Sequence, residues 1–205
     1  MDTRERILEA ATELFFRYGI KTVTMDDISR EIYVSKKTIY QYFKDKSEIV
    51  LTCTSGRLEQ QKEDLKKIHE DAKDVIEELV KLTGFFRKHL LNMNPTLLYD
   101  MQKYYPKAWE CFVSFREHCA LDLLSETLRK GIDQGYFRSG LNIEIISRMR
   151  MENVEMAFNT KVFPPKEFEL AEVQLQMFDH FIHGICTRKG LEYLENYQKQ
   201  AEVKD

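Results

Sequence analysis

The sequence predicts an all-α protein, and three observations support this fold class. Among 205 residues only 8 are Gly and 4 are Pro, so the chain lacks the turn residues that a sandwich or barrel needs about every 8–12 residues. Apolar residues recur at intervals of three and four along most of the chain, which is the spacing of amphipathic helices. Hydrophobic residues make up 43% of the sequence, enough for a substantial core in one or two domains.

The N-terminal region predicts three short helices. The first is expected over 4–18, where an apolar stripe at helical spacing is followed by Gly19 as the stop signal. The second begins after Thr24, a capping residue that is followed by acidic side chains in the first turn, and covers about eight residues. Ser35, a good N-cap, begins the third helix over 36–43.

The rest of the chain predicts a long connecting helix and a larger helical bundle. Asp45 or Ser47 can cap the connecting helix, and charged residues dominate its far half, 59–67, which we interpret as a solvated face. Beyond residue 71, breaks at four places divide the chain into about five helices: 92–95, 105–106, 135–140 and 163–165. The expected units are therefore 1–46, a connecting helix over 47–70, and 71–205.

Composition excludes several classes of protein. No stretch approaches the roughly 18 consecutive apolar residues of a membrane span. The first residues mix both charges and lack the pattern of a secretory signal, so we expect a cytoplasmic protein with no membrane partner. The four cysteines have no CxxC spacing and are expected to be reduced thiols.

The distribution of charge is more informative than its total. The net charge of −3 argues against a protein that coats nucleic acid through bulk positive charge. Residues 34–46, however, carry a net +3, which leaves −6 on the rest of the chain. An acidic body with one basic edge should weaken non-specific DNA binding and orient the approach to DNA.

The three N-terminal helices match the helix-turn-helix arrangement that fits a DNA major groove. Their second and third helices are joined by a tight turn, and the third begins with two lysines and a threonine. A helix N-terminus offers free backbone N–H groups to phosphates, while Lys, Thr and Tyr side chains can contact phosphates and base edges. The pattern therefore predicts that the third helix reads DNA.

These residues resemble the N-terminal signature of the TetR-type transcriptional regulators over about 45 residues. The resemblance is carried by Arg6-Ile7-Leu8-Glu9-Ala10-Ala11, Leu14-Phe15, Gly19, Thr22 to Thr24, Ile28, Val34-Ser35-Lys36-Lys37-Thr38-Ile39-Tyr40, Tyr42-Phe43 and Lys46. The remaining three-quarters of the chain is similar to the family only in helical content and in short stretches such as 131–137.

The resemblance implies a homodimer that places two recognition helices in successive major grooves of a pseudo-palindromic double-stranded DNA operator. It also implies a C-terminal domain that binds an unidentified small-molecule effector and changes the spacing of those helices. Carried over by position, Lys36, Lys37 and Thr38 are expected to meet bases, and Tyr40 a base or a phosphate. Thr24, Tyr42 and Lys46 are expected at phosphates, and Ser35 completes the expected DNA-binding set.

One residue departs from the family pattern. Tyr33 occupies the turn position where the family usually has Gly. A non-glycine residue in the left-handed region loses about 1–2 kcal/mol. The sequence therefore predicts either a positive φ at Tyr33 or a slightly wider turn between the second and third helices.

The C-terminal bundle offers weaker predictions. Aromatic residues are dense in its middle helices, and we expect Tyr105, Trp109 and Phe112 as walls of an effector pocket. By the resemblance, helices over 142–158 and 167–188 form the dimer interface, with an apolar surface that includes Ile146, Met149, Phe178, Phe181 and Ile182. The trio His180, His183 and Cys186 is better interpreted as packing than as a metal site, so no metal and no cofactor is expected.

The leading hypothesis is a one-component repressor that an effector releases from its operator. The alternative is a helical protein-interaction module that retains a helix-turn-helix. An enzyme is not expected, because the sequence contains no HExxH motif, no nucleophile elbow and no phosphate-binding loop, and no catalytic residue is predicted.

Overall fold

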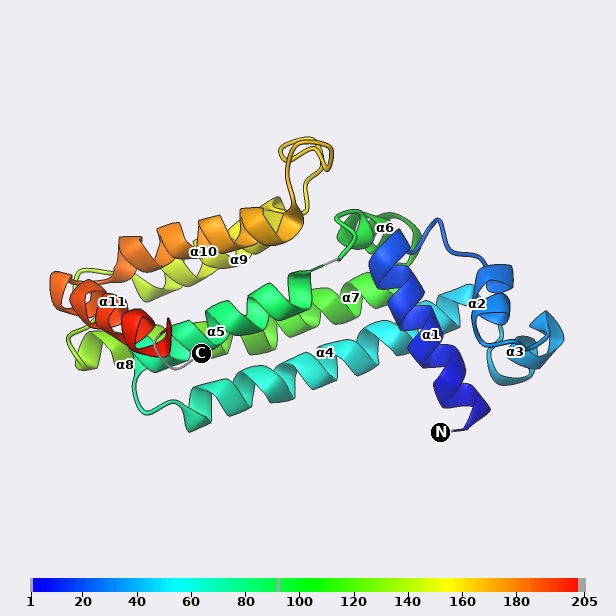
Figure 1. Cartoon of the computed structure of the whole chain (residues 1–205), viewed down its shortest axis with the longest axis horizontal. Helices are drawn as coiled ribbons and strands as arrows, with labels where there is room; N and C mark the ends of the chain where they lie inside the picture. The colour runs from blue at the N-terminus through cyan, green and yellow to red at the C-terminus, as the bar shows by residue number, and fades with distance from the viewer. Residues whose placement is uncertain (1, 92, 203–205) are drawn as a thin grey trace.

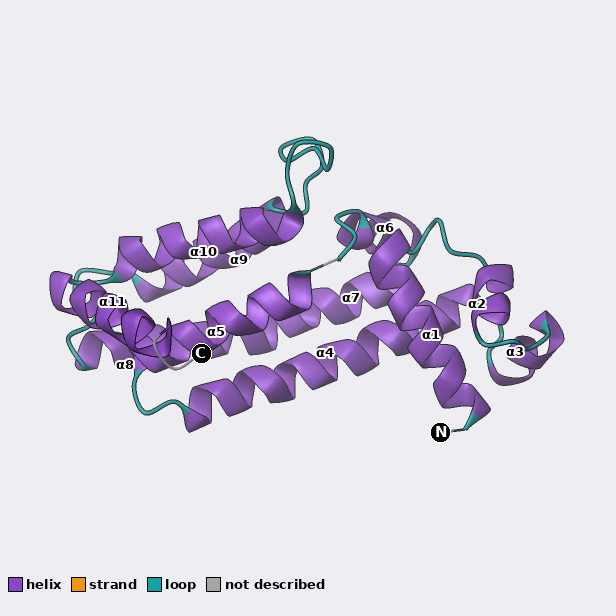
Figure 2. Cartoon of the chain, in the orientation of Figure 1, coloured by secondary structure: helices purple, strands orange, loops and turns teal. Residues whose placement is uncertain are grey.

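A computed structural model describes residues 2–91 and 93–202, and helices dominate this part of the chain, as Figure 2 shows. At one end of the molecule lie α1 (Thr3–Tyr18), α2 (Met25–Glu31) and α3 (Lys36–Tyr42), and the long α4 (Lys46–Asp71) leads from them into the bundle (Figure 1). The expected all-α class is confirmed. The described residues contain no strand, and only one isolated bridge pairs Phe137 with Cys186.

The bundle extends away from the N-terminal helices in three rows, as Figure 1 shows. The long α4 lies along one side, and α5 (Val75–Leu90) and α7 (Pro106–Phe115) run through the middle, with α8 (Leu121–Asp133) toward the far end. On the other side lie α9 (Ile143–Met156) and α10 (Leu170–Ile185). A short α6 (Leu97–Tyr104) lies beside α1, and α11 (Arg188–Glu202) covers the far end.

The four predicted breaks separate helices in the structure, but the count of about five helices is too low. The predicted helix between 106 and 134 contains one π-helical segment, Arg116–Ala120, between α7 and α8. A further break after Ile185 separates α10 from α11, which the sequence pattern did not reveal. That break depends on a contact between distant segments, because the backbone N–H of Arg138 donates to the carbonyl of Ile185 (2.9 Å).

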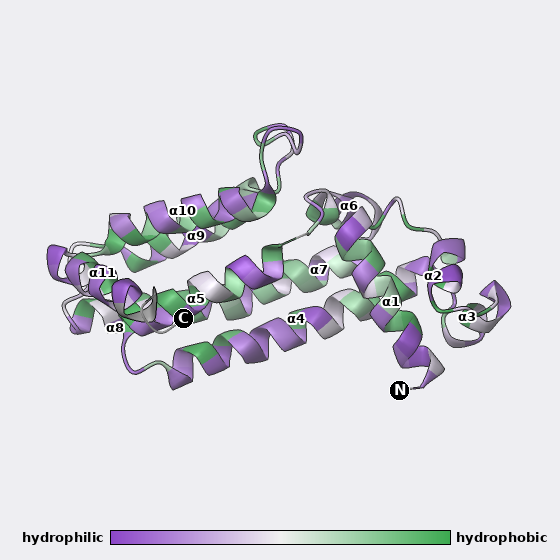
Figure 3. Ribbon diagram, in the orientation of Figure 1, coloured by the Kyte–Doolittle hydropathy of each residue, from purple (hydrophilic) through white to green (hydrophobic). Residues whose placement is uncertain are grey.

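The hydrophobic core falls into two clusters. One joins the inner faces of α1–α3 to α4, α6, α7 and the facing ends of α9 and α10, and it includes Phe15, Ile28, Ile39 and Phe43. The other joins α5, α8, α10 and α11 around Leu79, Leu128 and Phe178. Figure 3 shows hydrophilic residues along the outer part of α4, in agreement with its expected solvated face. The first cluster thus joins the helix-turn-helix unit to the bundle through shared packing.

Candidate DNA-binding helix and effector cavity

Side-chain caps set the start of the two helices of the helix-turn-helix unit. The backbone N–H of Asp27 donates to Thr24 Oγ1 (3.2 Å), and the Asp27 carboxylate accepts from the Thr24 N–H (2.8 Å). The Thr24 hydroxyl also donates to that carboxylate (2.7 Å), and this hydrogen bond is the main reason that the pKa of Asp27 is lowered. At α3, Ser35 Oγ accepts from the N–H of Thr38 (3.1 Å). Local sequence therefore fixes where both helices begin.

The prediction of a positive φ at Tyr33 is confirmed. Its φ is 57°, and it is the only non-glycine residue with positive φ among those described. Its side chain is 94% exposed, so no packing of the ring compensates for the strain. The next residue, Val34, donates its N–H to the carbonyl of Ser29 (3.0 Å), which closes the turn. The turn between α2 and α3 is therefore held by backbone geometry rather than by the tyrosine ring.

Helix α3 has one buried face and one open face. Ile39 and, just after the helix, Phe43 are buried in the core and hold the helix in place. The open face carries Lys37, Tyr40 and Tyr42, which are all exposed. Lys36 is also exposed and forms an ion pair with Asp26 (3.0 Å), which solvent weakens. Most of the residues that the sequence assigns to DNA therefore share the outer surface of α3 and its start.

Lys46 is held differently from the other expected DNA contacts. Its ammonium donates to the carbonyl of Ile20 (2.5 Å), which ties the start of α4 to the loop before α2. Burial lowers the pKa of Lys46, and the nearby negative charges of Asp100 and Asp27 oppose that shift. Thr24 is likewise occupied by its cap. A phosphate contact by either residue stays a prediction.

Two hydrogen bonds connect α1 and the loop before α2 to α6 and to the loop before it. The buried carboxylate of Asp100 on α6 accepts from the backbone N–H of Lys21 (2.8 Å). The N–H of Asn94 donates to the carbonyl of Phe16 at the end of α1 (2.6 Å). These contacts tie α6 and the loop before it to α1 and to the loop that precedes α2.

A cavity of about 460 Å³ lies between the N-terminal helices and the bundle. Residues of α1, α4, α5, α6, α7, α9 and α10 line it, and most of its wall is apolar. Its aromatic and aliphatic lining includes Phe16, Phe85, Phe86, Leu97, Leu98, Met101, Phe112 and Phe158. This volume is in the range of pockets that hold small organic ligands.

The cavity differs in part from the pocket that the sequence predicts. Phe112 lies in its wall, but Tyr105 and Trp109 do not, although all three pack against the N-terminal core cluster. The α1 and α4 residues of the wall were missed, because nothing in their helical spacing distinguishes a cavity wall from a packed core. Arg150 was also missed, although a cation on the apolar stripe between Ile146 and Val154 is a visible signal.

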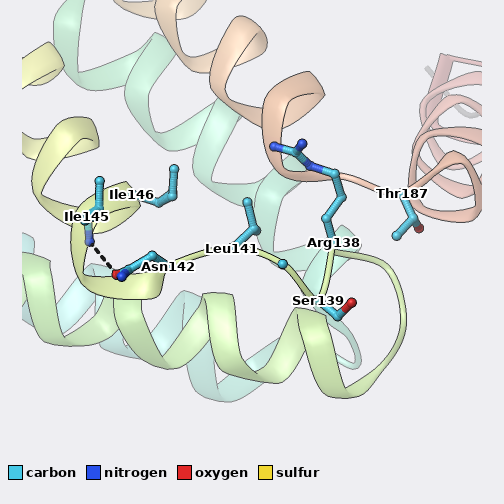
Figure 4. Close-up of a pocket in the computed structure, with 8 residues that line it drawn as sticks. Arg138, Ser139, Leu141, Asn142, Ile145, Ile146 and Thr187 are labelled. Atoms are coloured by element: carbon cyan, nitrogen blue, oxygen red, sulfur yellow. Dashed lines mark hydrogen bonds between the residues drawn. The ribbon is translucent and has the colours of Figure 1, made fainter.

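A second, open depression lies at the start of α9, and Figure 4 shows its residues. Asn142 caps α9 here by accepting from the N–H of Ile145 (3.1 Å). The Arg138 guanidinium donates to the carbonyl of Gly184 at the end of α10. The cation in this depression is thus already engaged by the protein, which makes the depression a weak candidate for an effector site.

The expected dimer residues divide into two groups. Phe178, Phe181 and Ile182 are each 4% exposed and belong to the core of the protomer, so their side chains offer no surface to a partner. Ile146 is half-buried, while Met149 is exposed. The sequence pattern identified an apolar face on α10, but that face packs inward.

The histidines near the end of α10 do not converge on Cys186. His180 and His183 are exposed, whereas Cys186 is buried. No group of three or more His, Cys, Asp or Glu side chains in the described residues is placed to hold a metal ion. Across 2–91 and 93–202, no helix has the length and the apolar character needed to cross a bilayer.

Comparisons with known proteins assign the N-terminal region. Residues 7–53 match the model of "Bacterial regulatory proteins, tetR family", and these residues hold the helix-turn-helix described above. The protein therefore carries the DNA-binding domain of the TetR family. It is therefore a transcriptional regulator with a helix-turn-helix for DNA binding, and this family is not a class of enzymes.

Similarity to other TetR-type regulators extends over most of the chain. The fatty acid metabolism regulator protein of Bacillus subtilis is 22% identical over 188 residues, which cover 89% of this chain and 95% of that protein. A TetR-family regulator from Agrobacterium tumefaciens has the same fold, with a TM-score of 0.73 and 19% identity over 90% of this chain and 97% of that one. The regulator FadR from Bacillus subtilis, solved with stearoyl-CoA, has a TM-score of 0.58 and 20% identity over 88% and 98% of the two chains.

Proposed function

We propose that this TetR-family protein is a one-component repressor of the bacterial cytoplasm. It acts as a homodimer that binds a pseudo-palindromic operator and leaves it when a small molecule enters the cavity. One observation carries the proposal: the cavity wall includes residues of α1 and α4. These helices flank the helix-turn-helix unit, so a molecule in the cavity would contact the elements that position the DNA-reading helix.

The route from the cavity to DNA is short. Leu8, Thr12 and Phe16 of α1 line the cavity, and so do Leu97, Leu98 and Met101 of α6. The Phe16–Asn94 hydrogen bond joins α1 to the loop before α6, and the Asp100–Lys21 hydrogen bond joins α6 to the segment before α2. If α1 and α6 can adopt two arrangements, a ligand that binds one of them more tightly would shift the protein toward that arrangement.

The dimer that the proposal needs has a candidate surface on α9. Ile145, Met149 and Met156 are 62%, 46% and 40% exposed, and their spacing of four and seven residues places them on one side of the helix. A twofold axis through this side would make a self-complementary interface. The open depression of Figure 4 adjoins the same side, because Ile145 belongs to both.

The proposed effector has an apolar body. The predominantly apolar cavity supports this, and so do two relatives, one named as a fatty acid metabolism regulator and one solved with stearoyl-CoA. The contact of such a ligand with α1 and α6 would give a coupling of about 1–3 kcal/mol between ligand and DNA, as is typical of allosteric proteins.

The proposal is tested by selecting bound sequences from a pool of random DNA duplexes. We expect the protein to enrich a pseudo-palindrome whose half-sites lie about 10 base pairs apart or a multiple of that. The double variant Lys36→Ala, Lys37→Ala should lose this preference, because it removes two cations at the start of α3.

The matched control is Lys62→Ala with Lys66→Ala on the exposed side of α4, which changes the net charge by the same amount. This control should recover the wild-type sequences. If the wild-type protein enriches no sequence, the repressor proposal fails and the alternative of a protein-interaction module gains support. If the Lys36 and Lys37 double variant recovers the same sequences with the same affinity, α3 is not the reading helix.

A further inference from the structure

We propose that the cavity binds an amphipathic carboxylic acid, and that Arg150 holds its carboxylate while the apolar body lies along the aromatic wall. The inference rests on the proposed effector function and adds the chemical class of the effector and the residue that selects it.

The first step is the burial of the Arg150 charge. Arg150 on α9 is only 3% exposed, and it lines the cavity. Its Nη1 is buried and has no hydrogen-bond partner among the described residues. Burial alone lowers its pKa to about 10, and no neighbouring carboxylate offsets that shift. At neutral pH the side chain is therefore still charged, and an unpaired buried cation is costly.

The second step is the orientation of the guanidinium. Its central carbon lies 5.0 Å from the ring centre of Phe178 and 5.8 Å from that of Phe181. Contact with aromatic rings uses the flat face of a guanidinium and leaves the N–H groups at its edge available. Two parallel N–H groups match the two oxygens of a carboxylate. The two rings therefore support the guanidinium from one side and leave its N–H groups for a carboxylate.

The third step compares three other nitrogen-bearing side chains of the cavity wall. Gln174 donates from its amide nitrogen to the carbonyl of Val154 (2.7 Å), so one of its two N–H donors is engaged, and the group carries no charge. The His89 Nδ1 pairs with the carbonyl of Phe85 (2.8 Å). Arg57 lies over the Phe16 ring (4.0 Å) and has Asp64 as a nearby opposite charge. Arg150 is thus the cation of the wall that lacks a counter-charge.

The experiment measures binding of decanoate, decanol and decylammonium to the full chain by titration calorimetry, below their aggregation concentrations. We expect decanoate to bind at least about tenfold more tightly than decanol, and decylammonium to bind most weakly, because only the anion pairs with Arg150. Equal affinity for decanoate and decanol would overturn the proposal without the need for any variant.

The variant arm uses Arg150→Met, with Arg148→Met as control. Arg148 lies on the same helix but is exposed and is not part of the cavity wall. We expect Arg150→Met to bind decanoate and decanol within about twofold of each other and to melt at a higher temperature than the wild type, since a buried unpaired charge is removed. The control should keep the wild-type preference.

Two results in the variant arm would contradict the proposal. One is a preference for decanoate that survives Arg150→Met. The other combines two observations. Arg150→Met melts at a lower temperature than the wild type, and Arg150→Gln keeps the wild-type ratio of decanoate affinity to decanol affinity. Together they would assign Arg150 to packing alone. Failure of the repressor proposal would be seen separately. It would appear in the selection of DNA sequences, whereas the calorimetric titrations measure ligand binding in the absence of DNA.

Discussion

Tyr33 shows how one residue can strain the recognition unit without altering its fold. The backbone at this position lies in the left-handed region (φ 57°), and the ring points into solvent. A side chain in this region costs about 1–2 kcal/mol, and a glycine recovers this but loses more conformational entropy on folding. The strain is tolerated because the packing of α2 and α3 on either side fixes the turn.

Replacing Tyr33 by glycine should therefore stabilise the protein. We expect Tyr33→Gly to raise the free energy of unfolding by roughly 0.5–1 kcal/mol, measured by urea denaturation. Tyr33→Ala is the control, since it removes the exposed ring but keeps the Cβ atom, and it should stay close to the wild type. A glycine variant that is no more stable than the alanine variant would show that the turn is not strained.

The cavity also shields a thiol. Cys53 lies in the cavity wall, and burial raises its pKa to about 11, as it does for Cys186. Because burial raises the pKa of both thiols in the folded protein, they stay protonated at pH 8. Their contribution to the free energy of unfolding is lost only as the pH rises through about 9 to 11.

Alkylation with iodoacetamide at pH 8, followed by mass spectrometry of the peptides, tests this prediction. We expect Cys53 and Cys186 to react about 100-fold more slowly than a thiol of ordinary pKa. Their labelling should accelerate as the pH approaches 11, whereas rapid labelling at pH 8 would contradict the buried placement.

At the scale of elements, α9 contributes both to the cavity wall and to the outer surface of the protein. Its inner side brings Arg150 to the cavity, and its outer side exposes Ile145, Met149 and Met156. If the outer side forms the dimer contact, a charge placed there should separate the protomers without unfolding them.

Met149→Glu is expected to shift the protein from dimer to monomer at micromolar concentration, measured by sedimentation equilibrium, because it would bury like charges across a twofold axis. Leu91→Glu is the matched control, since Leu91 is an exposed apolar residue (62%) that ends α5 rather than lying on α9. The interface assignment fails if Met149→Glu remains dimeric, or if both variants dissociate equally.

The elements differ in how far the sequence predicts them. Helices α1 to α4 begin with local caps, such as Thr24 and Ser35, and these signals can be recognised in a single chain. The start of α11 is different, because Gly190 fits against the carbonyl of Tyr136, where a Cβ atom would come within 2.3 Å. Contacts between distant segments of this kind are not visible in helical periodicity.

The same limit applies to the functional sites. The residues proposed to read DNA follow one another in sequence, so their grouping on α3 could be predicted. The cavity, in contrast, combines residues of seven helices. Spacing predicts that Phe178 and Phe181 lie on an apolar face, but only the packing of α10 against its neighbours shows that this face points inward.

At the scale of the whole molecule, the helix proposed to read DNA and the cavity proposed to bind an effector are parts of one packed unit. The cluster that holds Ile39 and Phe43 continues into α6, α7 and the ends of α9 and α10. Changes in the cavity can therefore reach α3 through direct packing. This continuity would be the physical basis for the proposed control of DNA binding by a small molecule.

The most direct test of this control is the dissociation constant for the selected operator, measured by fluorescence anisotropy at fixed salt with and without saturating decanoate. We predict that decanoate weakens operator binding by about 5- to 150-fold, that operator DNA weakens decanoate binding by the same factor, and that Arg150→Met shows neither effect. Decanoate that binds the protein while leaving the operator dissociation constant unchanged would contradict the coupling between cavity and DNA-reading helix.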